Sequence, residues 1–203
     1  MQVPYRGSDP ETPVQTHEAF QGQDDATAGS SDAADDESVD PYERARAICL
    51  NQLSYAARTR AHLESVLLKR KIPAEVATDV LDRFTELGLI NDAEYARAYA
   101  GSRQRSRGLS ARAIERELQG KGVSGDDIET ALAEMDDESQ RQTARGLVER
   151  KLRSLSGIDT QTATRRLVGM LARKGYAPSI AYSVVREVLG AAAAEAEIEP
   201  PLH

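Results

Sequence analysis

The sequence has no tryptophan, two phenylalanines and a single cysteine among its 203 residues. One cysteine, Cys49, excludes an internal disulfide and any zinc site built from several cysteines. With so few aromatic residues, Leu, Val, Ile and Ala must form the core, and a chain rich in Ala, Arg and Glu favours helices. No run of about 18 apolar residues occurs, so we expect no membrane-spanning helix.

The sequence also lacks the patterns that mark common catalytic sites. None of its three histidines, His17, His62 and His203, stands at metal-ligand spacing from a cysteine or a carboxylate. We expect His62 on a helix surface and Cys49 in the core. Neither a G-x-x-x-x-G-K-[ST] loop nor a G-x-G-x-x-G loop is present. These absences predict a protein that is not an enzyme and that needs no cofactor or metal.

Charge is distributed unevenly along the chain. The formal net charge is −9 over residues 1–40, +5 over 41–190 and −3 over 191–203. We call residues 41–190 the basic body. The composition predicts a disordered acidic tail over 1–40 and a flexible acidic tail over 191–203. The first tail fits either a solubilising segment or an electrostatic shield that competes with the basic body for its ligand. A basic body indicates a polyanionic or acidic partner.

Capping residues divide the basic body into helices. Asp40 before Pro41 predicts the start of the first helix. Further N-cap candidates precede other apolar periodic segments: Asn91, Ser110, Ser124, and Asp159 or Thr160. Candidate helix ends are the glycines Gly88, Gly120 or Gly122, Gly175 and Gly190, the last of which is expected to close the final helix.

Three segments of the body repeat one another: HLESVLLKRKIP (62–73), AIERELQGKGVS (113–124) and RLVGMLARKGYA (166–177). Their apolar and basic positions coincide, although Lys71 stands where the other two have Gly122 and Gly175. The repetition predicts an all-α protein of three-helix units over 41–90, 91–136 and 137–190. Stacked repeats of this kind form an elongated array. A compact helical bundle that arose by duplication is the alternative.

Basic residues gather in the second unit, where residues 97–121 carry a net charge of +5. These residues are Arg97, Arg103, Arg105, Arg107, Arg112, Arg116 and Lys121. The segment RGLVERKLR adds Arg150, Lys151 and Arg153 in the third unit. Concentrated like charge repels itself, so an anionic ligand explains it simply. Ordinary solvated helix faces are the alternative.

Four stretches between about residues 45 and 190 carry a resemblance to a known family. The most specific is LGLINDAEYARAYAGSRQRSRGLSARAIERELQGKGV. It is accompanied by LSYAARTRAHLESVLLKRKIP, RKLRSL and RRLVGMLARKGYAPSIAYSVV. On these stretches the chain resembles the RecX regulatory proteins, the negative modulators of the bacterial RecA recombinase. The resemblance does not extend to residues 1–40.

The resemblance implies tandem three-helix units in an elongated, curved molecule without a catalytic site. It also implies binding in the groove of the RecA–single-stranded DNA filament. Such binding opposes DNA recombination, ATP hydrolysis and the co-protease activity behind the SOS response of DNA repair. We therefore expect a cytoplasmic monomer with RecA as partner, single-stranded DNA as a further ligand and no membrane contact. A stand-alone nucleic-acid-binding protein of basic helical repeats is the alternative, and a scaffold for helical partners is another.

Overall fold

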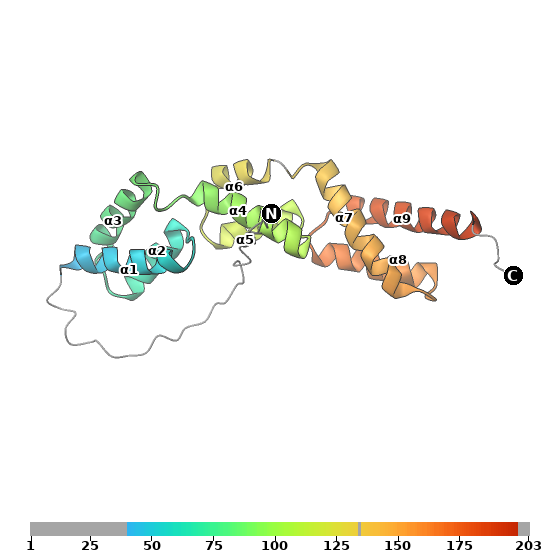
Figure 1. Ribbon diagram of the computed structural model, residues 1–203, viewed down its shortest axis with the longest axis horizontal. Coiled ribbons are helices and arrows are strands. Elements are labelled where there is room, and N and C mark those ends of the chain that lie inside the picture. The colour runs from blue at the N-terminus through green and yellow to red at the C-terminus, as the bar shows by residue number, and fades with distance from the viewer. Residues whose placement is uncertain (1–39, 134, 199–203) are drawn as a thin grey trace, which may run out of the picture. The chain divides into compact units, whose positions relative to one another are not determined.

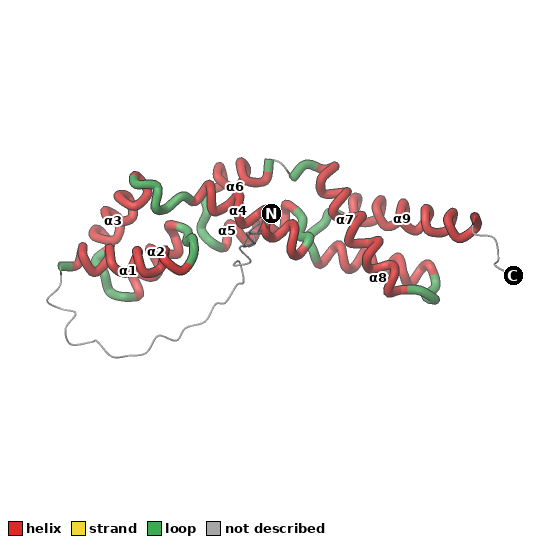
Figure 2. The backbone as a smooth tube through the Cα atoms, in the orientation of Figure 1, coloured by secondary structure: helices red, strands yellow, loops and turns green. Residues whose placement is uncertain are grey.

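A computed structural model of the chain describes residues 40–133 and 135–198. Within these ranges it contains nine α-helices and one short 3-10 helix, and no strand (Figures 1 and 2). The predicted all-α fold is therefore confirmed. The expectations for residues 1–39 and 199–203 lie outside the described residues.

The helices form three groups of three, because the more extensive helix–helix contacts lie within each group. The first unit comprises α1 (Pro41–Tyr55), α2 (Arg60–Lys69) and α3 (Ala74–Glu86). The second comprises α4 (Asp92–Arg107), α5 (Ala111–Gly120) and α6 (Gly125–Leu132). The third comprises α7 (Asp137–Leu152), the 3-10 helix η1 (Arg153–Leu155), α8 (Thr160–Arg173) and α9 (Pro178–Ile198). The predicted division into tandem three-helix units is confirmed.

Polar side chains cap the helix starts where the sequence predicts them. The Asp40 carboxylate accepts a hydrogen bond from the backbone amide of Tyr42 at 3.0 Å. The side chains of Asn91, Ser110 and Ser124 each accept a hydrogen bond from an amide three residues further on. Asp159, rather than Thr160, caps α8, and its hydrogen bond from the Thr162 amide lowers the Asp159 pKa. These contacts satisfy amides that lack a partner within the helix.

The prediction that Gly190 ends the last helix is wrong, because α9 continues through this residue to Ile198. The expected flexible tail is thus helical over residues 191–198. Four alanines follow Gly190, and alanine has the highest helix propensity of all residues. A single glycine inside a helix costs only about 1 kcal/mol, which packing of the preceding turns can offset.

The repeated apolar positions form the cores of the units. Six equivalent residues are fully buried: Leu63, Ile114 and Leu167, and then Leu67, Leu118 and Leu171. Cys49 belongs to the core of the first unit, as expected. Burial raises the pKa of its thiol to about 11. The sequence repeat therefore reflects one packing arrangement used three times.

Adjacent units meet through the middle helices α2, α5 and α8. The N-cap residue of one middle helix bonds to the C-cap carbonyl of the next. The Thr59 hydroxyl donates to the carbonyl oxygen of Lys121 at 2.9 Å, and the Ser110 amide donates to that of Lys174 at 3.0 Å. We call the first contact the 1–2 joint and the second the 2–3 joint. The Tyr176 hydroxyl reinforces the 2–3 joint by donating to the Gly108 carbonyl oxygen at 3.2 Å.

Close approach at the joints explains why two of the repeated helices are followed by glycine. Gly122 and Gly175 have positive φ values of 75° and 89°. A Cβ atom at Gly122 would lie 2.4 Å from Cβ of Ala61, and one at Gly175 would lie 2.6 Å from Oγ of Ser110. No side chain fits in such a gap. Lys71 adopts the same left-handed backbone in the first unit, where its turn is exposed.

Candidate functional site

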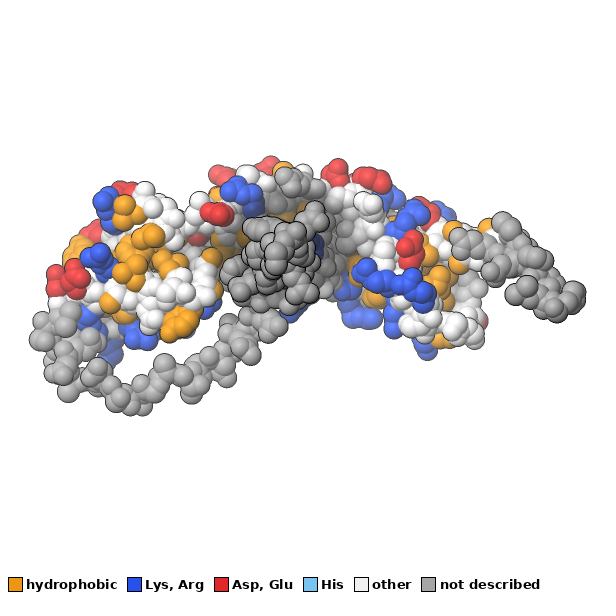
Figure 3. Space-filling view, in the orientation of Figure 1, with side chains coloured by type: hydrophobic (Ala, Val, Ile, Leu, Met, Phe, Trp, Pro, Cys, Tyr) orange, Lys and Arg blue, Asp and Glu red, His pale blue; other side chains and the backbone are white. Residues whose placement is uncertain are grey.

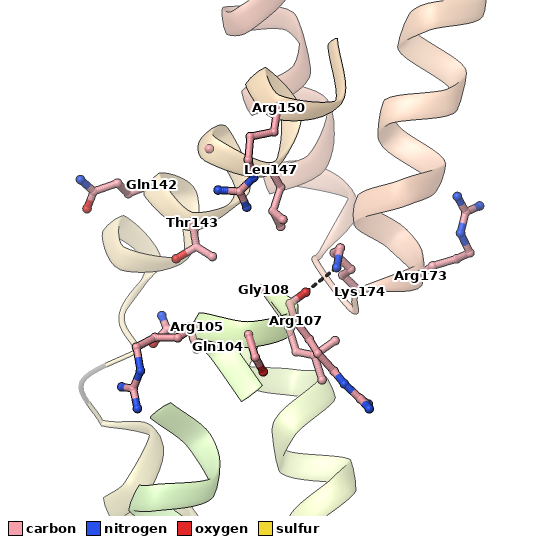
Figure 4. Close-up of a pocket in the computed structure, with 13 residues that line it drawn as sticks. Gln104, Arg105, Arg107, Gly108, Gln142, Thr143, Leu147, Arg150, Arg173 and Lys174 are labelled. Atoms are coloured by element: carbon pink, nitrogen blue, oxygen red, sulfur yellow. Dashed lines mark hydrogen bonds between the residues drawn. The ribbon is translucent and has the colours of Figure 1, made fainter. Parts of the chain in front are cut away.

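A cleft of about 860 Å³ lies beside the 2–3 joint, between the C-terminal end of α4, the helix α7 and the C-terminal end of α8 (Figure 4). Five of its lining residues are basic: Arg105, Arg107, Arg150, Arg173 and Lys174. Among the residues that the structure describes, its lining includes no carboxylate. We call this site the basic cleft.

Helix ends place most of these cations. Arg105 and Arg107 lie in the last turn of α4, which ends at the left-handed Gly108. Arg173 ends α8 and Lys174 is its C-cap residue. The C-terminus of a helix carries partial negative charge, so cations there are stabilised. The Lys174 ammonium group also donates to the carbonyl oxygen of Arg107, so part of its role is to cap α4.

The basic cleft holds more positive charge than its surroundings neutralise. Ion pairs occur elsewhere in the described part of the chain, for example Arg145–Glu187 at 2.6 Å and Arg60–Asp82 at 2.7 Å. Within residues 40–133 and 135–198, no such pair includes a cation of the basic cleft. Its four arginines are exposed and Lys174 is half-buried. Like charges gathered in this way attract an anion and increase its association rate.

Neutral polar groups accompany the cations. Gln104, Gln142 and Thr143 line the same cleft. In the close-up, Arg150 extends from α7 toward the end of α4, whereas the guanidinium groups of Arg105, Arg107 and Arg173 point outward (Figure 4). The space-filling view shows further basic side chains over the α7–α8 region (Figure 3). The arrangement suits a polyanion that enters from solvent.

Arg103 has a different environment from its neighbours in the SRQRSR segment. It is only 8% exposed, its Nε lies 3.3 Å from Oε2 of Glu117, and its guanidinium lies 4.7 Å from the Tyr99 ring centroid. The Tyr99 hydroxyl donates to Glu117 at 2.8 Å, and burial followed by this bond raises the Tyr99 pKa. Tyr95 stacks on Tyr99 with centroids 5.9 Å apart, as core packing predicts. Arg103 therefore stabilises the second unit and does not line the basic cleft.

The remaining predicted site residues are dispersed. Arg97, Arg112, Arg116, Lys151 and Arg153 are exposed and lie outside the basic cleft lining. Lys121 is half-buried, with Nζ 5.3 Å from the Tyr99 ring centroid. The basic cleft thus joins Arg105 and Arg107 with Arg150, which the sequence places in a separate cluster. It adds Arg173 and Lys174, whose only signal in the sequence is their position at the end of the third repeated helix.

Other kinds of site find no support in the described residues. Residues 40–133 and 135–198 contain no group of three His, Cys, Asp or Glu side chains that could hold a metal ion. Over the same ranges, no helix combines the length and apolar character needed to cross a bilayer. The basic cleft is the candidate that the geometry favours.

Family models match all three units. The model "RecX, first three-helix domain" matches residues 45–84, the second-domain model matches 91–132 and the third-domain model matches 138–185. Proteins named "Regulatory protein RecX" are similar over most of the chain. That of Streptomyces coelicolor is 49% identical, with 81% of this chain and 87% of the relative covered. That of Thermobifida fusca is 44% identical, with 90% and 96% covered.

Solved structures share the fold. The crystal structure of RecX from Lactobacillus salivarius aligns with a TM-score of 0.67 at 24% identity, covering 73% of this chain and 96% of that one. A second crystal structure, of a regulatory protein RecX, aligns with a TM-score of 0.64 at 24% identity and covers 73% and 72%. At this identity the likeness supports the arrangement of helices alone.

Proposed function

The chain belongs to the RecX family of regulatory proteins, and on this premise we propose that it binds the RecA–single-stranded DNA filament and negatively modulates it. The modulated activities are strand exchange, ATP hydrolysis and the co-protease function. The observation that carries the proposal is the match of all three units to RecX domains, together with 49% identity to the regulatory protein RecX of Streptomyces coelicolor. The chain itself supplies binding rather than a catalytic step.

The repeated joints support a partner that is itself repetitive. Both joints pair the N-cap residue of one middle helix with the C-cap carbonyl of the next, through the Thr59 hydroxyl at the first and the Ser110 amide at the second. Units related by like contacts present like surfaces in succession. A helical filament also presents like surfaces in succession, one for each protomer. We propose that successive units contact successive RecA protomers, as a monomer acting in the cytoplasm.

The basic residues supply the electrostatic part of this binding. We propose that Arg105, Arg107 and Arg150 meet acidic protein surface or DNA phosphate on the filament. They are exposed, and the part of the cleft lining that the structure describes places no carboxylate beside them, which supports this role. Exposed charges of this kind chiefly raise the association rate, and salt weakens their effect.

The basic cleft also favours a second candidate, a nucleic-acid-binding protein that acts without a recombinase. The two candidates differ in what binds when RecA is absent. For the second, affinity for DNA alone must be high and must fall linearly with salt on logarithmic axes, because bound counterions are released. DNA binding too weak to titrate at physiological salt excludes it.

The test of the leading proposal is single-stranded-DNA-dependent ATP hydrolysis by RecA, with this protein titrated up to an equimolar ratio. We expect inhibition below equimolar ratios, because one bound molecule would block extension of a filament. Hydrolysis that is unchanged at an equimolar ratio contradicts the proposal.

A charge-reversed variant tests whether the basic cleft is responsible for the inhibition of ATP hydrolysis. The double change Arg105→Glu and Arg107→Glu is expected to weaken inhibition roughly tenfold, equivalent to about 1.4 kcal/mol. Arg166→Glu is the matched control, because Arg166 is an exposed arginine of α8 outside the basic cleft. Unchanged inhibition by a folded double variant removes Arg105 and Arg107 from the mechanism.

A further inference from the structure

We propose that the basic cleft is a binding site for adjacent phosphate groups, and that a phosphate chain bound there ties the second unit to the third. The cations come from both sides of the 2–3 joint. Arg105 and Arg107 belong to α4 of the second unit, whereas Arg150 and Arg173 belong to α7 and α8 of the third. An anion that contacts both sets bridges the joint. The inference rests on the same basic residues as the proposed function, but its test contains no recombinase, so the two can fail separately.

The pockets beside the two joints differ in their carboxylates. The pocket beside the 1–2 joint is lined by Arg60 together with three carboxylates, Glu64, Asp92 and Asp127. There the Asp92 carboxylate accepts a hydrogen bond from the Arg60 amide at 2.9 Å, and the Arg60 side chain pairs with Asp82. In that pocket the carboxylates outnumber the single cation, so its lining is net acidic. At the 2–3 joint the described lining holds five cations and no carboxylate, so this pocket attracts an anionic ligand and the other does not.

Lys174 couples the basic cleft to the 2–3 joint. Its backbone oxygen accepts from the Ser110 amide at 3.0 Å, and its ammonium group donates to the carbonyl oxygen of Arg107. The same residue lines the basic cleft. Repulsion among the neighbouring cations therefore acts directly on the contacts that hold the two units together. An anion that neutralises them stabilises those contacts.

The chemistry of the lining favours phosphate over carboxylate. Four of the five cations are arginines, whose planar fork donates two parallel hydrogen bonds to phosphate oxygens. The side-chain amide of Gln142, and the N–H of Gln104 that does not bond to Ser139, can donate to the remaining oxygens. A cleft of about 860 Å³ with cations on three helices exceeds what one phosphate can contact. A chain of linked phosphates, in a small polyphosphate or in the nucleic-acid backbone, matches this spread of charge.

The test measures phosphate binding by the full-length protein without RecA. Inorganic tripolyphosphate and a short oligothymidylate are titrated by calorimetry at low salt. We expect both to bind, and Arg150→Gln to weaken binding about tenfold, equivalent to about 1.4 kcal/mol. Arg166→Gln is the matched control and is expected to leave binding unchanged. Thermal unfolding without ligand checks that both variants fold.

Comparison of the two ligands identifies the source of the phosphate groups. Binding of tripolyphosphate alone identifies a small polyphosphate as the ligand, and binding of the oligonucleotide alone identifies the nucleic-acid backbone. Either result supports a phosphate site if Arg150→Gln weakens it and Arg166→Gln does not. Equal effects of the two variants overturn it. Oligoglutamate that binds as tightly as tripolyphosphate also overturns it, because the site then selects carboxylates.

Hydrogen exchange tests whether the bound chain ties the units. Saturating tripolyphosphate is expected to slow exchange of the Ser110 amide, which bonds across the 2–3 joint. The Arg60 amide beside the 1–2 joint is the internal control and is expected not to change. If tripolyphosphate binds but the Ser110 amide exchanges no more slowly, the bound chain does not stabilise the contact between the second and third units.

Discussion

Lys71 and Gly175 end equivalent helices in the same left-handed backbone conformation, with φ values of 60° and 89°. A lysine in this conformation costs about 1–2 kcal/mol that glycine avoids. The first unit tolerates lysine because its turn is exposed. The turn of the third unit lies against the start of α5 and leaves no room for a Cβ atom. Glycine therefore occurs where the turn takes part in a joint, and lysine occurs where the turn is exposed.

The substitution Gly175→Ala is expected to lower the free energy of unfolding by about 2–4 kcal/mol, because it combines a left-handed alanine with overpacking. The new Cβ would lie 2.6 Å from Oγ of Ser110 and 2.7 Å from Cβ of Ala113. Denaturant unfolding with linear extrapolation measures the change. A loss below about 0.5 kcal/mol would show that the 2–3 joint can open without cost.

Lys71→Gly is the matched control for that experiment. It relieves the strained backbone but adds conformational freedom to the unfolded chain, so the net change is expected to stay within about 1 kcal/mol. A loss as large as that of Gly175→Ala would mean that the Lys71 side chain contributes contacts of its own.

Tyr176→Phe is expected to weaken the 2–3 joint in a pH-dependent way. Removal of its hydrogen bond to the Gly108 carbonyl costs about 1 kcal/mol near neutral pH. Burial raises the Tyr176 pKa from 10.0 to about 12, so the folded state holds the phenol proton more tightly than the unfolded state. The resulting stability is complete below pH 10 and is lost as the pH rises toward 12.

Unfolding curves at about pH 8 and about pH 11 test this linkage. The wild-type protein should lose more stability between the two than Tyr176→Phe does. Tyr182→Phe is the control, because Tyr182 is 60% exposed and its loss should change neither curve. Equal losses for the wild type and Tyr176→Phe would contradict a buried Tyr176 in solution.

The thiol of Cys49 is expected to be unreactive in the folded protein. Its side chain is fully buried, and its pKa of about 11 leaves little thiolate near pH 8. A disulfide reagent should modify it only as fast as the first unit unfolds, and at once in denaturant. Fast modification of the native protein would place Cys49 outside the core.

Arg103 and Arg105 are expected to differ sharply despite their proximity in the sequence. Arg103→Gln breaks a largely buried pair with Glu117 and should cost about 2–4 kcal/mol in the free energy of unfolding. Arg105→Gln changes an exposed side chain and should cost less than about 0.5 kcal/mol, while it weakens RecA inhibition. The reverse order in unfolding experiments would contradict the placement of both residues.

Local patterns in the sequence predict the helices well, because caps and apolar periods act within a few residues. Asp40, Asn91 and Ser110 cap their helices as expected. The prediction that the last helix ends at Gly190 is wrong because four alanines follow this glycine. Their high helix propensity outweighs the cost of a single glycine inside the helix. The resemblance carried by residues 45–190 led to the correct family.

The sequence predicts less of the site, because the site depends on how the units meet. Arg103, Arg105 and Arg107 look equivalent in sequence, yet a helix turns about 100° per residue and places Arg103 on the buried face with Tyr99. Arg173 enters the basic cleft only because the turn after α8 lies against the start of α5. No period along the chain encodes that contact.

Sedimentation of this protein with preassembled RecA–single-stranded DNA filaments tests the central claim most directly. The account predicts that the protein sediments with the filament at physiological salt. It also predicts that a smaller fraction of the protein sediments with RecA alone or with DNA alone. Arg105→Glu with Arg107→Glu should reduce the sedimented fraction, and Arg166→Glu should not. A protein that stays in the supernatant with filaments, or that sediments equally with bare DNA, would contradict the account.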